Sequence, residues 1–598
     1  MRKIAQKHPH SGTSMSRAGA TPVGQQSRFA LSITAAIALS AVSLICHAQQ
    51  QPPTAGDALR EVQERPKTPL PSGAPSLEVQ DKRRAVKPVQ GLNTDVKAFR
   101  FTGLTVVRED ELRAQLQSFI GPAKTFDDLQ AAVDAVSEYL QRRGYIVAQA
   151  YLPEQKIENG IVEIAVLEGR LGQVRVDMEP DVPVSRSMIE GLLSPLTPGT
   201  ILHRDVVERS LFLVSDLRGL NVRSIVEPGS TPGTSDLVLK ITAGRRVDGT
   251  VEFDNNTSRF TGDYRLGGSV NFNSPFRRGD LLSFRGLLGI PGGGADLDFG
   301  RVSYLTPIGN YGTKIGVAYL RLNYHLGTSL FDRLDQSGRS EVASIFGLHP
   351  IVRTRNFNLF GQASFDAREF VDTRGAVGLK SERKTKVGGL SVVGDSRDAY
   401  LRGGINNFSV AYTAGDLEIR TPADLAADQA TGTGRRTEGG YQRINFSASR
   451  LNTLVASTVA FVSYSYQYAS KNLDASEKIG LGGPNAVRAY AVGEATSDEA
   501  HLVNAEVRTT LPQPSFMPGN LVGLAFFDWA RGRLNKDPLA LEAANNIRVL
   551  RGVGVGLTWS KQDDFLLRGT LAWRLSGAPL SDPQEKKPRV FFQLQKNL

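Results

Sequence analysis

From about residue 247 to the C-terminus, the chain is a succession of segments in which apolar and polar side chains alternate. An apolar face against lipid and a polar face against a water-filled lumen is the pattern that a strand of a transmembrane barrel requires. We therefore predict a large β-barrel in a membrane. In residues 565–575, for example, one face carries Phe565, Leu567, Leu571, Trp573 and Leu575, and the other carries Arg568, Thr570 and Arg574.

The alternating region accommodates sixteen strands, an even number as expected for a bacterial barrel. The alternation is weakest in the fourth and fifth of these segments. The predicted strands start near residues 247, 263, 280, 296, 311, 341, 355, 385, 402, 440, 456, 500, 520, 549, 564 and 590.

The connections between these strands alternate in length. Short periplasmic turns and long surface loops are typical of such barrels, so the parity places the N-terminal modules at residues 96–244 in the periplasm. Short connections follow even-numbered strands at residues 273–279, 306–310, 350–354 and 396–401, and long ones follow odd-numbered strands at 325–340, 367–384, 414–439 and 531–546.

The N-terminus has the features of an export signal. Arg17 and Arg28 precede an apolar stretch at residues 29–45, which ends in Cys46-His47-Ala48. A basic region, an apolar core and a small-residue cleavage site predict a secretory signal peptide over residues 1–48. The alternative is an uncleaved membrane anchor; a lipoprotein is excluded because Ile45 stands where a small residue is needed.

Composition excludes several classes of site. The only cysteine, Cys46, lies in the predicted signal, so the mature chain offers no disulfide, thiolate metal site or cysteine nucleophile. The remaining histidines show no ligand spacing, and we expect no metal, cofactor or nucleotide. The net charge of +11 comes from residues of mixed sign, which does not favour nucleic-acid binding. We therefore expect that the protein is not an enzyme.

Residues 49–95 form a polar, proline-rich segment. Residues 56–64 could make two turns of helix, with disorder as the alternative. Five prolines between residues 66 and 88 then predict an extended linker.

Two similar α+β modules follow, at residues 96–170 and 171–244. In the first, apolar residues at 126, 129, 133, 136 and 140 mark one face of a helix, and the order is β-α-α-β-β. The second repeats this order. Tandem modules of this kind constitute an internal repeat.

Each module would leave the edge of a small sheet open, and an open edge can bind an extended peptide by β-augmentation. A client-binding role is thus available, and a plain spacer is the alternative. The candidate partner-binding residues on predicted strands are Tyr145, Val147, Tyr151, Leu220 and Val222.

A glycine-rich surface loop, inserted at about residues 470–499, carries the sequence GGPNAVRAYAVGE at residues 482–494 with Arg488 at its centre. An arginine on a surface loop often only meets solvent. On the strand at residues 521–529, however, Phe526 and Asp528 point into the lumen. A carboxylate there invites a bidentate ion pair with Arg488, which would fix the loop inside the pore.

This loop motif, the Phe526-x-Asp528 strand, the signal, the linker and the two modules together resemble the outer-membrane transporters of two-partner secretion. These form the haemolysin secretion/activation family, within the barrel-assembly superfamily, and the modules resemble polypeptide-transport-associated (POTRA) domains. The resemblance covers nearly all of the mature chain. It departs from the family's pattern at Ala489, where glycine is common.

The resemblance implies a sixteen-stranded barrel with two periplasmic modules in a Gram-negative outer membrane. It implies that the loop folds back so that Arg488 meets Asp528, and that the helix at residues 56–64 can plug the pore. The remaining motif positions are Gly482, Gly483, Val487, Tyr490 and Phe526.

The function so implied is capture of a large unfolded exoprotein, with an N-terminal secretion domain, and its passage through a monomeric barrel in outer-membrane lipid. The alternatives are an assembly factor for membrane proteins and a general porin. Two modules with a helix and linker argue against the first, and about 150 residues of periplasmic domain argue against the second.

A second glycine run, Gly552, Gly554 and Gly556, lies inside a strand with Val553 and Val555 facing outward. We interpret these glycines as space in the barrel wall, available to the packed loop, and not as a phosphate-binding loop.

Overall fold

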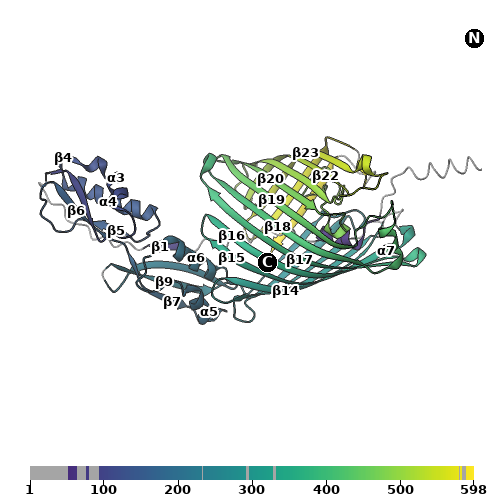
Figure 1. Ribbon diagram of the computed structural model, residues 1–598, viewed down its shortest axis with the longest axis horizontal. Coiled ribbons are helices and arrows are strands. Elements are labelled where there is room, and N and C mark those ends of the chain that lie inside the picture. Colours follow the sequence, from purple (N-terminus) through teal and green to yellow (C-terminus); the bar gives the residue numbers. More distant parts are fainter. Residues whose placement is uncertain are drawn as a thin grey trace, which may run out of the picture. The chain divides into compact units, whose positions relative to one another are not determined.

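The barrel of the computed structural model is closed and contains sixteen strands, β10 to β25, each paired with its sequence neighbours and the last with the first (Figure 1). The predicted fold class and strand number are confirmed. The structure describes residues 52–62, 76–79, 93–231, 233–290, 295–327, 332–577, 579–581 and 588–598, so the predicted signal peptide lies outside the described residues. The strands are β10 (Val247–Asp254), β11 (Tyr264–Asn273), β12 (Leu281–Ile290), β13 (Asp296–Ile308), β14 (Thr313–His325), β15 (Gln336–Arg353), β16 (Phe357–Arg374), β17 (Leu379–Asp398), β18 (Gly404–Ile419), β19 (Gly439–Val455), β20 (Thr458–Ala469), β21 (Glu499–Thr510), β22 (Asn520–Arg533), β23 (Ile547–Lys561), β24 (Phe565–Arg574) and β25 (Arg589–Asn597).

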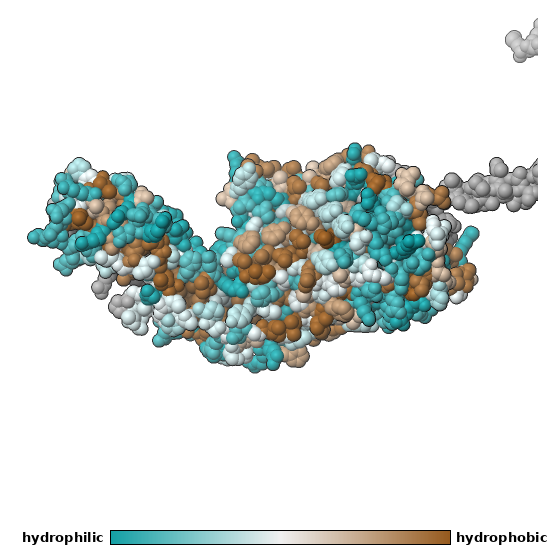
Figure 2. Space-filling model, viewed as in Figure 1, coloured by the Kyte–Doolittle hydropathy of each residue, from teal (hydrophilic) through white to brown (hydrophobic). Residues whose placement is uncertain are grey.

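The alternation of side chains follows from the pleat, which sends successive residues to opposite faces of the wall. On β23, Val555 and Leu557 are exposed on the outer face, while Leu550 is buried on the inner one. Figure 2 shows apolar residues gathered over the outer wall of the barrel. This outer face is the one that meets lipid.

One predicted loop is wrong. Residues 367–384 were expected to form a long connection, but β16 and β17 remain paired from Phe357↔Ser396 to Arg374↔Leu379 and are joined only by residues 375–378. The alternation in this region is charged on both faces, because the ribbon continues beyond the part of the wall that faces lipid. A membrane pattern therefore gives no signal there.

The first module contains two sheets and two α-helices. Its helices bury the apolar residues at positions 129, 133, 136 and 140 against the larger sheet, as the periodicity predicted. The longer helix begins with a capping box between Thr125 and Asp128. The elements are β2 (Thr94–Val96), β3 (Ala98–Thr102), α3 (Glu109–Gln115), β4 (Gly121–Lys124), α4 (Phe126–Arg142), β5 (Gln149–Tyr151) and β6 (Ile161–Leu167), with sheets β3-β6-β5 and β2-β4.

The second module repeats the pattern, with one addition. Strand β1 (Ser76–Val79), within the stretch predicted to be a linker, pairs in parallel with β8. No sequence pattern indicates this pairing, because a segment of four residues is too short to show a periodicity. The elements are β7 (Arg170–Met178), α5 (Arg186–Leu193), α6 (Arg204–Ser215), β8 (Leu220–Pro228) and β9 (Thr234–Ala243), in the sheet β1-β8-β9-β7.

The second module is joined to the barrel at the short-turn end. The guanidinium of Arg353, at the end of β15, donates to both carboxylate oxygens of Asp216 at 2.9 and 2.8 Å and lies 4.4 Å from the ring centre of Phe212. Ser274, in the β11–β12 turn, donates to the carbonyl of Pro183. These contacts place the module at the ends of the strands opposite the long loops.

A short helix, α2 (Ala55–Val62), lies inside the barrel (Figure 1). Its buried residues Ala55, Ala58, Leu59 and Val62 pack against inward-facing side chains of β12 to β16. Among the described residues, no helix has the length and apolar character needed to cross a membrane.

Candidate gating site

The β20–β21 loop, residues 470–498, turns back into the barrel. Its tip packs into a cluster of buried residues that includes Val487, Ala489 and Tyr490 from the loop, and Leu502 and Leu550 from the wall. This burial is unusual for a glycine-rich surface loop, since loops normally run over the surface. The tip is therefore held by specific contacts with the wall.

Arg488 makes the central contact. Its Nε donates to Oδ2 of Asp528 at 2.9 Å, and its Nη2 donates to Oδ1 at 2.7 Å. Its backbone N–H also donates to Oδ2 at 3.0 Å. The guanidinium carbon lies 3.5 Å from the ring centre of Phe526. The structure thus brings together the three residues that the sequence singled out for this interaction.

Two further residues complete this site, and the sequence reasoning missed both. Glu506 accepts a 2.6 Å hydrogen bond from Nη1 of Arg488. Asn504 donates to Oδ1 of Asp528 at 2.7 Å and to the carbonyl of Ala486 at 2.8 Å. Both lie on the inward face of β21, so the alternation could have identified them. We call Arg488, Asn504, Glu506, Phe526 and Asp528 the Arg488 pocket.

Charge balance explains why the stability of this pocket depends on Arg488. One guanidinium lies between two carboxylates, and the Asp528 side chain has no exposed surface. Removing one partner of a buried pair leaves an uncompensated charge and costs about 3–5 kcal/mol. Loss of Arg488 would leave the Asp528 carboxylate buried without its guanidinium partner, whereas Glu506 would keep its 2.7 Å contact with Arg508. The tip of the loop would then lose the ion pairs that hold it against the barrel wall.

The other motif residues shape the loop. Gly482 donates its N–H to the carbonyl of Glu494 at 3.2 Å, and Gly483 adopts a φ of +119°, which favours glycine. Val487 is buried, and the Tyr490 hydroxyl donates to the carbonyl of Ser576. Ala489 has no positive φ, so alanine meets no backbone strain there.

The wall provides space for the tip. A Cβ at Gly552 would lie 2.6 Å from the Cβ of Ala489, and one at Gly554 would lie 2.2 Å from the ring of Phe526. Two of the three glycines of this run thus admit the loop and the ring on which Arg488 stacks. This is the role in the wall that we inferred from their position in the strand.

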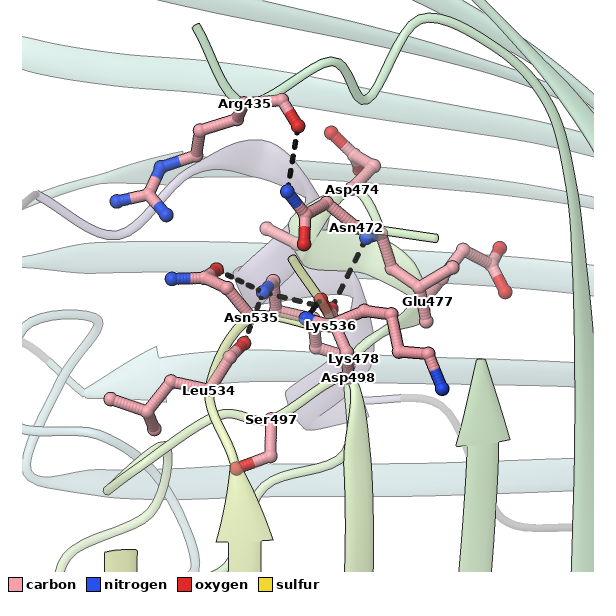
Figure 3. Close-up of polar contacts among 12 residues, drawn as sticks. Arg435, Asn472, Asp474, Glu477, Lys478, Ser497, Asp498, Leu534, Asn535 and Lys536 are labelled. Atoms are coloured by element: carbon pink, nitrogen blue, oxygen red, sulfur yellow. Dashed lines mark hydrogen bonds and ion pairs between the residues drawn. The ribbon is translucent and has the colours of Figure 1, made fainter. Parts of the chain in front are cut away.

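The base of the loop is held by a separate set of polar contacts (Figure 3). Nζ of Lys478 lies 2.8 Å from the Asp498 carboxylate and donates to the carbonyl of Leu534 at 2.6 Å. Asn472 donates to the carbonyl of Arg435 at 2.7 Å. These contacts connect the two ends of the loop with the neighbouring surface loops.

Helix α2 rests on the same loop. The short helix η5 (Ala475–Glu477) is so close to α2 that a Cβ at Gly56 would lie 2.8 Å from the backbone nitrogen of Ser476. On the barrel side, Asp372 accepts from the N–H of Ala55 at 2.7 Å. Helix and loop therefore occupy the lumen in mutual contact.

Glu61, near the end of α2, is half-buried against the β10–β11 loop. Burial raises the pKa of the Glu61 carboxyl, and hydrogen bonds from Thr261 and Ser258 offset this only in part. A raised pKa means that the docked helix favours the protonated acid.

The candidate partner-binding residues differ in placement. Tyr151, on β5 at the edge of the first module's sheet, is exposed by 44%. Val147, Leu220 and Val222 pack against the core of the second module, and the edge of β8 is paired with β1. The Tyr145 ring packs edge-on against His203 between the modules. Among the five, Tyr151 is the one exposed on a strand edge.

The described residues include no group of three or more histidine, cysteine, aspartate or glutamate side chains arranged to hold a metal ion.

Comparison with known proteins adds independent findings. The family model described as "Haemolysin secretion/activation protein ShlB/FhaC/HecB" matches residues 233–559, and "POTRA domain, ShlB-type" matches residues 94–169. The heme/hemopexin transporter protein HuxB of Haemophilus influenzae (strain 86-028NP) is 29% identical over 466 residues, which are 77% of this chain and 80% of that protein.

A second relative is the outer membrane transporter CdiB of Escherichia coli O6:K15:H31 (strain 536 / UPEC), 25% identical over 491 residues, which are 79% of this chain and 73% of that protein. The solved structure of CdiB from Escherichia coli superposes with a TM-score of 0.64 at 18% identity, covering 97% of this chain and all of that one. The barrel with its periplasmic modules is thus a shared fold.

Proposed function

Because the chain belongs to the haemolysin secretion/activation protein ShlB/FhaC/HecB family, we propose that it exports one large exoprotein through a barrel that is closed at rest. It is an outer-membrane transporter of the two-partner secretion type, and its POTRA modules are periplasmic. Its partner is a secreted exoprotein, which we propose carries an N-terminal secretion domain and is captured unfolded by a monomeric transporter.

We propose that each segment of the chain has a separate function. Residues 1–48 direct export and are removed, and residues 49–95 supply the plug helix and its linker. The modules at residues 96–170 and 171–244 receive the partner, and residues 245–598 form the barrel.

The gate consists of two elements in one lumen. Helix α2 and the β20–β21 loop touch each other at Gly56 and Ser476, and both would have to move for a polypeptide to pass. The observation that carries this proposal is the burial of Arg488 between Asp528 and Glu506. These ion pairs hold the β20–β21 loop in one position, and breaking them would release the loop.

Docking of the partner is proposed at the edge of the first module. Strand β5 is short and pairs on one side with β6, and Tyr151 is exposed there. An extended segment could add to this edge by backbone hydrogen bonds, with Tyr151 contacting alternate side chains. The substitution Tyr151→Ala should weaken capture of the partner without changing insertion of the barrel into the membrane.

The two alternative functions predict different structures. An assembly factor would release its client sideways into lipid, and a porin would have an open lumen at rest. Helix α2 and the folded loop instead pack against the inner wall and occupy part of the lumen, which disfavours the porin.

The test is Arg488→Ala, compared with Arg285→Ala as the control. Arg285 also faces the lumen and pairs with a carboxylate, Glu252, but lies outside the Arg488 pocket. We expect Arg488→Ala to abolish export of the partner while the barrel still inserts, and Arg285→Ala to export normally. Normal export by the Arg488 variant would exclude the proposed gate.

A further inference from the structure

The outer faces of β20 to β23 differ from the rest of the wall at the ends that carry the long loops. These ends lie opposite the periplasmic module and so face the extracellular leaflet. On β22 the outward series runs through Ala525, Phe527 and Trp529 and then changes to Arg531 and Arg533. The apolar belt of this sector ends at that level.

Aromatic side chains mark the same level on the neighbouring strands. Register pairs connect Tyr466 with His501, His501 with Arg531, and Trp529 with Arg551. The Tyr466 and His501 rings are 4.7 Å apart, and Tyr464 and His501 share a 2.9 Å hydrogen bond. Aromatic belts of this kind sit at the headgroup level of a membrane.

Two cations of this sector lack acidic partners. Arg531 and Arg551 are exposed, and neither has an ion pair or side-chain hydrogen bond with any residue that the structure describes. Arg533 and Lys536 both contact one carboxylate, that of Glu499. Two guanidiniums on adjacent strands are thus left to bind an anion from outside the chain.

Outward arginines near the long-loop ends of other strands have carboxylate partners. Arg321 and Arg339 both lie within 4 Å of Glu341, at 3.7 and 3.6 Å, and Lys384 lies 3.0 Å from Glu369. Unpaired outward arginines are therefore not a general property of this barrel's rim. The contrast points to a ligand that is specific to the β20–β23 sector.

We propose that Arg531 and Arg551, flanked by Tyr466 and Trp529, bind the phosphorylated glycolipid of the outer leaflet. A guanidinium matches a phosphate with two parallel hydrogen bonds, and the aromatic rings offer apolar faces to sugar and acyl chains. The position of the two arginines favours a lipid phosphate over free phosphate in solution, because the arginines lie directly beyond the apolar belt that contacts the membrane. This site goes beyond secretion and depends only on location in the outer membrane.

The experiment uses the full-length protein purified in a mild detergent and fluorescently labelled lipopolysaccharide. The test variant is Arg531→Gln/Arg551→Gln, and the matched control is Arg321→Gln/Arg339→Gln, which removes two outward arginines of β14 and β15 that contact Glu341. Three competitors are compared: lipopolysaccharide stripped of its lipid A phosphates, phosphatidylglycerol, and inorganic phosphate. Resistance of the barrel to unfolding in a heated gel sample shows that each variant is folded.

We expect the test variant to bind lipopolysaccharide at least about tenfold more weakly, because hydrogen bonds between charged groups are stronger than those between neutral groups and two such contacts are lost. The control should change by less than about twofold, since exposed paired arginines contribute little. The stripped lipid should fail to compete. Equal affinity of test variant and wild type would overturn the proposal, as would full competition by phosphatidylglycerol or by inorganic phosphate.

Discussion

Gly552→Ala is a demanding test of how the loop tip is seated. The new Cβ would lie 2.6 Å from the Cβ of Ala489, whereas apolar carbons pack at about 3.5–4.0 Å. Overpacking of this kind costs about 1–3 kcal/mol. Because about 1.4 kcal/mol is a factor of ten, the ratio of seated to unseated loop should fall about 5- to 150-fold.

Trypsin cleavage after Arg488 measures the unseated loop, because that residue is buried when the loop is in place. Cleavage tracks the open population when reclosing is faster than cutting. We expect Gly552→Ala to accelerate this cut by the factor above. Gly569→Ala is the control, since no atom lies within 4 Å of its added Cβ.

The double variant Gly552→Ala/Ala489→Gly sharpens the test. It removes the Cβ that the new methyl would strike, so cleavage after Arg488 should return to within a few-fold of wild type. Wild-type cleavage in Gly552→Ala, or no recovery in the double variant, would refute the proposed seating of the loop against the wall.

Three further predictions concern the helix and the periplasmic joint. Gly56→Val should displace α2, because a Cβ there would lie 2.8 Å from Ser476 N, and single-channel recordings should show more frequent openings. Docking of α2 should be most favourable below the ordinary glutamate pKa of 4.5 and should weaken as the pH rises through the raised pKa of Glu61. Channel activity should therefore rise with pH, and an unchanged pH response in Glu61→Gln would contradict this. Arg353→Met leaves Asp216 without its bidentate partner, and spin labels on module and barrel should report a broader distance distribution; an unchanged distribution would refute the anchoring role.

Much of the barrel could be predicted from the sequence, because lipid on one side and water on the other impose a strict period of two. The Arg488–Asp528 contact followed from that period, since it placed Asp528 on the inner face. The same reasoning could have found Asn504 and Glu506, which face inward on β21. They were missed because a carboxylate or amide in a polar lumen is ordinary by itself.

Other features depend on contacts that leave no local pattern. Strand β1 is defined by its pairing with β8, and the ribbon of β16 and β17 extends where both faces are polar. The contact of Gly56 with Ser476 joins residues 420 positions apart, and nothing in either segment indicates the other. Tertiary packing decides such features.

The most direct test of the gated conduit is a reversible crosslink between α2 and the wall. Ser340 donates to the carbonyl of Ala55 at 2.8 Å, and the predicted mature chain has no cysteine. In Ala55→Cys/Ser340→Cys, with the two thiols joined by a short reducible crosslinker, export of the partner should stop when the crosslink forms and return on reduction, while each single variant exports under both conditions. Undiminished export from a fully crosslinked population would contradict the proposal that the helix must leave the lumen.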